Sequence, residues 1–277
     1  MTPATVKQLV KQLRPMTLPD VAQLCATSRA AMRAMESAYA GASPSQDEAI
    51  LQWLETDPAN TGNCGCLDRQ NLVHELSAHA MLRRWPRSYD RRGIVERELF
   101  ARAPAGTASA MLADGLDGFK ATLCRLSADA GGAAAFRRHP VNNGVDVAGA
   151  MVVYPDYSLI DEQLSRILAF LRAHARSQPA FAAIVAYAGI CNLHPLPDGN
   201  GRLARMLYNL VVRSAFPNAF YLPIYEISAL SQMGLIIRLR QADYHGKWLP
   251  LIAMLSGAVC RLATQQPAPR PRRSWTK

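Results

Sequence analysis

The stretch His194-Pro-Leu-Pro-Asp-Gly-Asn-Gly-Arg-Leu-Ala-Arg205 decides how the fold is interpreted, because it places a turn directly before a helix. Gly199 and Gly201 allow backbone conformations with positive φ and the close approach of a ligand. The apolar residues that then recur at helical spacing, up to Pro217, are Leu203, Met206, Leu207, Leu210 and Val211. Because a helix N-terminus offers unpaired N–H groups and the positive end of its dipole, the pattern predicts a site for an anion.

The polar side chains of this stretch have chemistry that suits a phosphate site. Arg202 and Arg205 share a helix face and can hold phosphate oxygens through charge-assisted hydrogen bonds. Asp198 is the only carboxylate in the stretch, and one carboxylate together with substrate phosphates is a usual way to bind Mg²⁺. His194, with an ordinary pKa near ~6.5, can take a proton from a nucleophile. Singly these residues are typical of turns and solvated helix faces, but together they predict phosphoryl or nucleotidyl transfer.

The stretch resembles the signature of the Fic family, His-Pro-Phe-x-Asp/Glu-Gly-Asn-Gly-Arg-x-x-Arg, with Leu196 in place of the phenylalanine. Upstream, Ala135-Phe136-Arg137 and an apolar alternation over Val145 to Tyr154 are similar to the family's approach to its flap, and they predict a small β-hairpin. The resemblance covers about residues 107–263. It implies a mainly α fold, a Fic-type helical bundle with a small β-hairpin flap that pairs with a target segment by strand addition.

The resemblance implies that a nucleotide, most often AMP from ATP, is transferred to a Ser, Thr or Tyr hydroxyl of a target protein. By carry-over, His194 would deprotonate that hydroxyl and Asp198 would hold Mg²⁺ across the phosphates. Arg202 would steady the leaving pyrophosphate, and Arg205 would contact its terminal phosphate. Leu196 would pack under the loop, as the family phenylalanine does, with a smaller buried area.

The phosphate-binding backbone is also carried over from the family. Gly199 and Gly201 would form the anion hole with their N–H groups, and Asn200 would hydrogen-bond the α-phosphate. The family variants that transfer phosphate or phosphocholine replace the first or both of these glycines. The two glycines here therefore favour nucleotide transfer, with AMP, UMP or another base left open.

Regulation of many Fic proteins depends on a helix of the form Ser/Thr-x-x-x-Glu-Gly/Asn, whose glutamate pairs with the last arginine of the signature. The sequence has no intact copy, because Ala40 occupies the glutamate position in residues 36–41 and an alignment on Glu36 loses the flanking residues. We therefore expect Arg205 to be free, with inhibition absent or supplied by a separate protein. Removal of AMP from a target normally relies on the same glutamate.

The composition limits the classes of protein to which the chain can belong. The 277 residues are 49% hydrophobic, which supports a sizeable core, and no apolar stretch reaches the ~18 residues needed to span a membrane. Residues 1–13 lack the apolar region of a signal peptide, so we expect cytoplasmic synthesis, which is compatible with translocation into a host cell as an effector. The six cysteines are expected to be reduced, since Cys64-Gly65-Cys66 has no second pair at zinc spacing.

Three segments organise the chain in this interpretation: residues 1–106 as a helical extension packed on the core, 107–264 as a Fic-like catalytic core and 265–277 as a disordered basic tail. The helices expected around the core span residues 6–13, 20–40, 48–55, 67–84, 93–101, 107–127 and 179–191. Ser158 and Asp161 form a candidate capping box for a further helix.

Two alternatives from other classes stay open. One is a nucleotide-binding module of the same fold without turnover, or one that transfers another phosphate-linked group, and the retained His194 argues against a silent module. The other is a basic nucleic-acid-binding protein, suggested by the net charge of +10 and by arginines between residues 83 and 92. We interpret that charge as a solvated surface and expect neither nucleic acid nor a membrane as partner.

Overall fold

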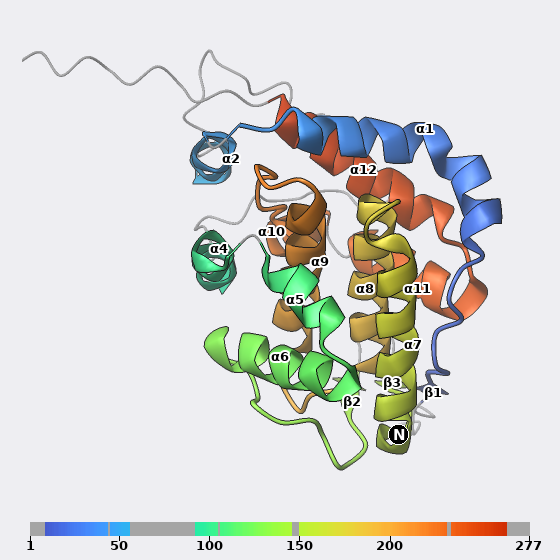
Figure 1. Cartoon of the computed structure of the whole chain (residues 1–277). Coiled ribbons are helices and arrows are strands. Elements are labelled where there is room, and N and C mark those ends of the chain that lie inside the picture. The colour runs from blue at the N-terminus through green and yellow to red at the C-terminus, as the bar shows by residue number, and fades with distance from the viewer. Residues whose placement is uncertain are drawn as a thin grey trace, which may run out of the picture.

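The structure is a computed structural model that describes residues 9–43, 45–55, 92–104, 106–145, 150–231 and 234–264. It is mainly helical, with one small sheet at an end of the helical bundle (Figure 1). The helices are α1 (Val21–Ala40), α2 (Gln46–Glu55), α4 (Arg92–Arg102), α5 (Thr107–Ala113), α6 (Leu116–Asp129), α7 (Ile160–His174), α8 (Pro179–Leu193), α9 (Asn200–Ala215), α10 (Ile224–Leu230), α11 (Gly234–His245) and α12 (Leu249–Ala263).

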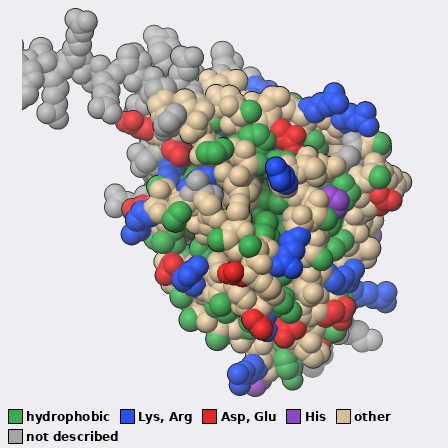
Figure 2. Space-filling model, viewed as in Figure 1, with side chains coloured by type: hydrophobic (Ala, Val, Ile, Leu, Met, Phe, Trp, Pro, Cys, Tyr) green, Lys and Arg blue, Asp and Glu red, His purple; other side chains and the backbone are tan. Residues whose placement is uncertain are grey.

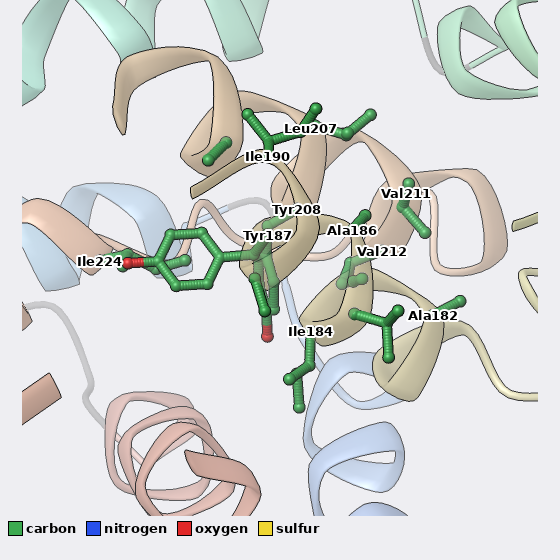
Figure 3. Packing of buried hydrophobic residues seen from close by; sticks show 14 of the residues in the cluster. Ala182, Ile184, Ala186, Tyr187, Ile190, Leu207, Tyr208, Val211, Val212 and Ile224 are labelled. Atoms are coloured by element: carbon green, nitrogen blue, oxygen red, sulfur yellow. The ribbon is translucent and has the colours of Figure 1, made fainter. Parts of the chain in front are cut away.

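The centre of the molecule is α8, which is apolar on every side. All of its residues are buried except Cys191, as expected for a helix surrounded by others. It packs chiefly against α9 and α7, and Figure 3 shows Tyr187 and Ile190 of α8 beside Leu207 and Tyr208 of α9. This packing fixes the end of α8 relative to the start of α9, where the signature stretch lies.

α1, in the N-terminal part of the chain, packs against α12 and α8. Asp20 caps α1 by accepting hydrogen bonds from the N–H groups of Ala22 and Gln23. α1 then lies along α12 (Figure 1), and the hydroxyl groups of Tyr39 and Tyr208 meet at 3.1 Å. The expected helices over residues 20–40, 48–55 and 93–101 are confirmed as α1, α2 and α4. The segment boundary at residue 106 stays a prediction.

The sheet has the order β1-β3-β2, with strands β1 (Leu9–Gln12), β2 (Asn142–Val145) and β3 (Ala150–Val153). β2 and β3 pair antiparallel in the region expected for the flap, with an irregular register between Asn142 and Val145, and residues 146–149 lie outside the described residues. β1 pairs parallel with β3, with Leu9 opposite Ala150. The helix expected over residues 6–13 is therefore wrong, because pairing with a distant strand satisfies this backbone and outweighs the weak local helical pattern.

Two other local expectations are also corrected. The helix expected over residues 107–127 divides into α5 and α6 at Asp114 and Gly115. The capping box of Ser158 and Asp161 is wrong, because the carboxylate of Asp156 instead caps a 3₁₀ turn (Tyr157–Leu159) through the N–H of Ser158, at 2.8 Å. Asp156 lies two residues before Ser158, so its carboxylate can accept the Ser158 N–H locally. This bond takes the place of the reciprocal bonds expected between Ser158 and Asp161.

The described surface carries charges of both signs. Figure 2 shows Lys and Arg side chains interspersed with Asp and Glu side chains over the viewed face. Cys124, Cys191 and Cys260 are free thiols, as expected. None of the helices in the described ranges combines the length and apolarity that crossing a bilayer requires. The helix expected over residues 67–84, the Cys64–Cys66 pair, the arginines between 83 and 91 and the basic tail lie outside the described residues.

Candidate active site

The signature stretch forms the connection between the two central helices. α8 ends at Leu193, and His194 adopts the left-handed conformation with φ 51° and ψ 55°. His194 is the one non-glycine residue with positive φ among the described residues. α9 begins at Asn200, directly after Gly199 with φ 90°. Non-glycine residues with positive φ persist where the surrounding structure holds them, often at functional sites.

Leu196 and Asn200 close the loop between them. The side chain of Leu196 is fully buried under the loop, which confirms its expected anchoring role. The amide oxygen of Asn200 accepts a hydrogen bond from the N–H of Leu196 at 2.8 Å, and its amide nitrogen donates to the Leu196 carbonyl at 2.7 Å. The Asn200 side chain therefore fixes the loop, and its expected contact with an α-phosphate stays a prediction.

A glycine-to-glycine contact supports the loop from the side. A Cβ atom on Gly199 would lie 2.8 Å from the Cα of Gly132, which leaves no room for a side chain. The N–H of Ala133 also donates to the carbonyl of Asp198 at 3.2 Å. The segment after α6 thus holds the backbone from which the N–H groups at the start of α9 project, a role that the sequence analysis did not assign to it.

Arg137 joins the signature loop to the flap. Its Nε donates to the carbonyl of His194 at 2.7 Å, and its Nη2 donates to the carbonyls of Leu193, at 3.2 Å, and Pro155. Arg137 is 4% exposed, and burial lowers the pKa of its guanidinium. From the sequence, Arg137 stands out only within the Fic resemblance; in the structure, its side chain holds the end of α8 and the end of β3 together.

The imidazole of His194 is neutral at physiological pH. Burial is the main reason that its pKa falls from 6.5 to about 4, and the positive charges of Arg240 and Arg137 lower it further. Its Nδ1 lies 3.4 Å from the carbonyl oxygen of Cys191. If Nδ1 carries the proton and donates there, Nε2 keeps a lone pair that can accept a proton from a hydroxyl group.

Arg202 and Asp198 are paired at the loop surface. Nη2 of Arg202 lies 2.7 Å from Oδ2 of Asp198, whose side chain is 76% exposed, and Nη1 donates to the carbonyl of Ala130 at 3.2 Å. Within the described part of the chain, no group of three or more His, Cys, Asp or Glu side chains is placed to hold a metal ion. A cation at Asp198 would therefore depend on oxygen ligands from a bound substrate.

Arg205 is paired, so the expectation that it is free is wrong. Its Nε and Nη2 donate to Oε2 and Oε1 of Glu96 at 2.8 and 2.6 Å, and Glu96 is fully buried. The hydroxyl of Tyr221 also donates to Oε2 of Glu96 at 2.8 Å. Glu96 lies on α4 with Arg92 and Arg97 at the positions where the inhibitory pattern has Ser/Thr and Gly/Asn, so a search for that pattern could not find it.

The guanidinium of Arg205 remains next to the start of α9 despite this pairing. A Cβ atom on Gly201 would lie 3.0 Å from Nη1 of Arg205. The ring of Tyr225 also lies under the Arg205 guanidinium, with the ring centroid 5.2 Å from its central carbon. Gly199, Gly201, Arg202 and Arg205 therefore lie at the first turns of α9, after His194 at the end of α8, and their joint use as a phosphate site stays a prediction.

Comparison with known proteins gives a family for this site. Residues 118–212, which include the whole signature stretch, match the model of the Fic/DOC family. Members of the family transfer AMP or other groups to proteins. No curated protein matches the chain at a significant level.

Solved structures were also compared with this chain. A Fic family protein from Desulfovibrio desulfuricans G20 is 16% identical, with a TM-score of 0.52 over 90% of this chain and 75% of that chain. Fic-1 (residues 134–508) from C. elegans is 18% identical, with a TM-score of 0.49 over 87% of this chain and 72% of that chain. At these identities the first likeness supports the mainly helical Fic fold alone.

Proposed function

We propose that the protein transfers a nucleotide, AMP in the first instance, from a nucleoside triphosphate to a Ser, Thr or Tyr hydroxyl of a target protein. The observation that carries this proposal is the neutral imidazole of His194, held beside a helix N-terminus that has arginines on its first turns. A base next to an anion-binding backbone is the arrangement that attack of a hydroxyl on a phosphate requires.

The residues of the loop then have separate tasks. Nε2 of His194 accepts the proton of the target hydroxyl while the hydroxyl oxygen attacks the α-phosphorus, and the bond from that phosphorus to pyrophosphate breaks. The backbone N–H groups of Gly199, Asn200 and Gly201 stabilise the charge on the α-phosphate oxygens. Arg202 and Arg205 stabilise the pyrophosphate that leaves. Catalysis of this kind depends on positioning and charge, which a loop fixed by Asn200 and Arg137 can provide.

Asp198 suits the single carboxylate that a Mg²⁺ ion shares with nucleotide phosphates. Its carboxylate is open to solvent, and Arg202 fixes its orientation through one oxygen. When bound, the ion would neutralise phosphate charge during transfer. Residues of this chain other than Asp198 are not needed as metal ligands in this proposal.

The pairing of Glu96 with Arg205 supports a restrained resting state. A terminal phosphate would need the same Nε and Nη2 hydrogens that Glu96 now accepts. The contact therefore corresponds to the one that the inhibitory glutamate of other Fic proteins makes, supplied here from α4. We propose that nucleotide binding in the productive position requires Arg205 to leave Glu96, so that restraint does not require a separate inhibitory protein.

The target protein is expected to bind at the flap, and the order of the strands limits which strand a target segment can pair with. β3 is already paired with β1 on one side and β2 on the other, so its backbone has no free edge. Within the flap region of Val145 to Tyr154, a target strand is therefore expected to add beside β2 rather than beside β3.

The decisive experiment is incubation of the purified protein with Mg²⁺ and each labelled nucleoside triphosphate, in the presence and absence of candidate targets. Label transferred to protein by the wild type and not by His194→Ala would support the proposal and would name the base. A matched variant is His174→Ala, which removes a half-buried histidine of α7 away from the loop. Nucleotide binding without any label transfer would instead favour a binding module of the same fold.

A further inference from the structure

Tyr154 lies against the imidazole of His194. It follows the last residue of β3, it is 4% exposed, and its ring stacks on the imidazole with centroids 3.7 Å apart and an angle of 11° between the planes. Tyr154 lies outside the signature stretch. Because the two rings are nearly parallel and in contact, rotation of the imidazole about its Cβ–Cγ bond would drive it into the tyrosine ring.

The backbone on both sides of this stack is fixed by one side chain. Arg137 donates hydrogen bonds to the carbonyl of His194 and to the carbonyl of Pro155, the residue after Tyr154. The N–H of Tyr154 also donates to the carbonyl of Val141 at 3.1 Å. The end of the flap and the end of α8 are therefore held at a fixed separation, and the stack follows from that separation.

α11 holds Tyr154 from another direction. The central guanidinium carbon of Arg240 lies 5.7 Å from the centroid of the Tyr154 ring, and Nη1 of Arg240 lies 3.2 Å from Oδ2 of Asp243. The Asp243 side chain is fully buried. A buried acid thus fixes the arginine that contacts the tyrosine.

We propose that Tyr154 is a positioning residue that fixes the ring plane of His194, and that Arg240, anchored by Asp243, holds Tyr154 in place. With the plane fixed, Nδ1 stays near the carbonyl of Cys191, and Nε2 is left for the incoming hydroxyl. The catalytic consequence rests on the proposed nucleotidyl transfer, whereas the position of the ring can be measured without any turnover.

The first measurement is the NMR signal of the His194 Cε1–H in protein labelled at histidine, assigned through His194→Ala. The stacked ring shifts this signal upfield. We expect Tyr154→Phe to keep the shift, Tyr154→Leu to lose it, and Arg240→Met to reduce it. The matched control is Tyr157→Leu, at an exposed tyrosine three residues further along the chain. An unchanged His194 signal in a folded Tyr154→Leu protein would overturn the proposal.

The second measurement is the rate of label transfer in the same variants. We expect Tyr154→Leu to lower kcat by up to about 100-fold, as for a misplaced catalytic group, with nucleotide affinity unchanged. Tyr154→Phe should restore most of the rate, because a phenyl ring keeps the stack. A loss confined to KM, or an equal loss in both variants, would contradict a positioning role. If the wild type transfers no label, the proposed function fails, and the NMR signal still decides where the ring lies.

Discussion

Glu96 and Arg205 form a two-point ion pair that joins α4 to the start of α9. The carboxylate accepts hydrogen bonds from Nε and Nη2 of the guanidinium at 2.8 and 2.6 Å, and it receives a third from the hydroxyl of Tyr221 at 2.8 Å. Glu96 has no exposed surface, and the Arg205 side chain is 15% exposed. The arginine best placed for a terminal phosphate is thus engaged by the protein itself.

Replacing Glu96 by Gln is expected to increase nucleotide affinity and the rate of label transfer. The neutral amide competes less well for the guanidinium, and a hydrogen bond to a charged group is worth about 1.5–3 kcal/mol, or roughly a tenfold effect or more. Calorimetric titration with ATP and Mg²⁺ measures the affinity. Glu98→Gln, at an exposed carboxylate on the same helix, is the matched control. Equal affinities in wild type and Glu96→Gln would rule out competition at Arg205.

The transfer rate should not show the titration of an ordinary histidine. Burial lowers the pKa of His194 from 6.5 to about 4, so the base stays unprotonated as the pH falls through 6.5 and is lost only as the pH approaches 4. Initial rates of label transfer between pH 4 and pH 8 test this. A fall in rate centred near pH 6.5 that persists when target binding is saturated at each pH would show that His194 is more exposed to water than the structure indicates.

The free energy of unfolding should also depend on pH through His194, and it should fall as the pH falls from 6.5 to 4. The unfolded chain binds a proton at His194 near pH 6.5, whereas the folded chain does so only near pH 4, so this residue costs stability progressively as the pH falls from 6.5 to 4. Urea unfolding of His194→Ala should therefore be less sensitive to pH in this window than unfolding of the wild type. An equal pH dependence for both proteins would contradict the buried state of the imidazole.

Gly199→Ala should damage both the loop and the reaction. The residue has φ 90°, and an added Cβ would lie 2.8 Å from the Cα of Gly132, so we expect a loss of about 1–3 kcal/mol from strained backbone and a large loss of transfer. Gly257→Ala on α12 is the control, because no atom lies near its added Cβ, and helix propensity predicts a gain of up to about 1 kcal/mol. Similar unfolding free energies for the two variants would refute the close contact.

Asp243 should make the protein less stable as the pH rises. Burial raises the pKa of this carboxyl group from 3.8 to about 7, although Arg240 opposes the shift. The folded state keeps the proton between pH 3.8 and 7 while the unfolded state loses it, so stability falls across this window by at most about 1.4 kcal/mol per pH unit. Asp243→Asn, compared with Asp161→Asn at an exposed carboxylate, should flatten the dependence measured by urea unfolding. A slope equal to that of the wild type would exclude the buried carboxyl group as its source.

Local sequence patterns were sufficient for the loop and the central helices. The two glycines, the buried Leu196 and the apolar residues after Arg202 are consecutive in sequence, so the helix–loop–helix connection could be predicted from a dozen residues. α8 could be predicted for a related reason, because its continuous apolar composition leaves only a buried position.

Contacts between distant residues could not be predicted in the same way. Glu96 and Arg205 are 109 positions apart, and neither Arg92 nor Arg97 fits the inhibitory pattern, so only the packing of α4 on α9 reveals the pair. Tyr154 directly follows an apolar strand, where a tyrosine is common, so the sequence gives no sign of its contact with His194. That contact depends on Arg137, whose side chain hydrogen-bonds the backbone of His194. Tertiary packing decides these positions, and no local propensity encodes it.

The parallel pairing of β1 with β3 sets an order of events during folding. Leu9 lies opposite Ala150, so during synthesis the first strand leaves the ribosome long before its partner exists. Pairing of such distant segments is slow, because the loop between them must close first. We therefore expect β1 to be placed late, and until then the edge of β3 that receives it is open to strands from other chains.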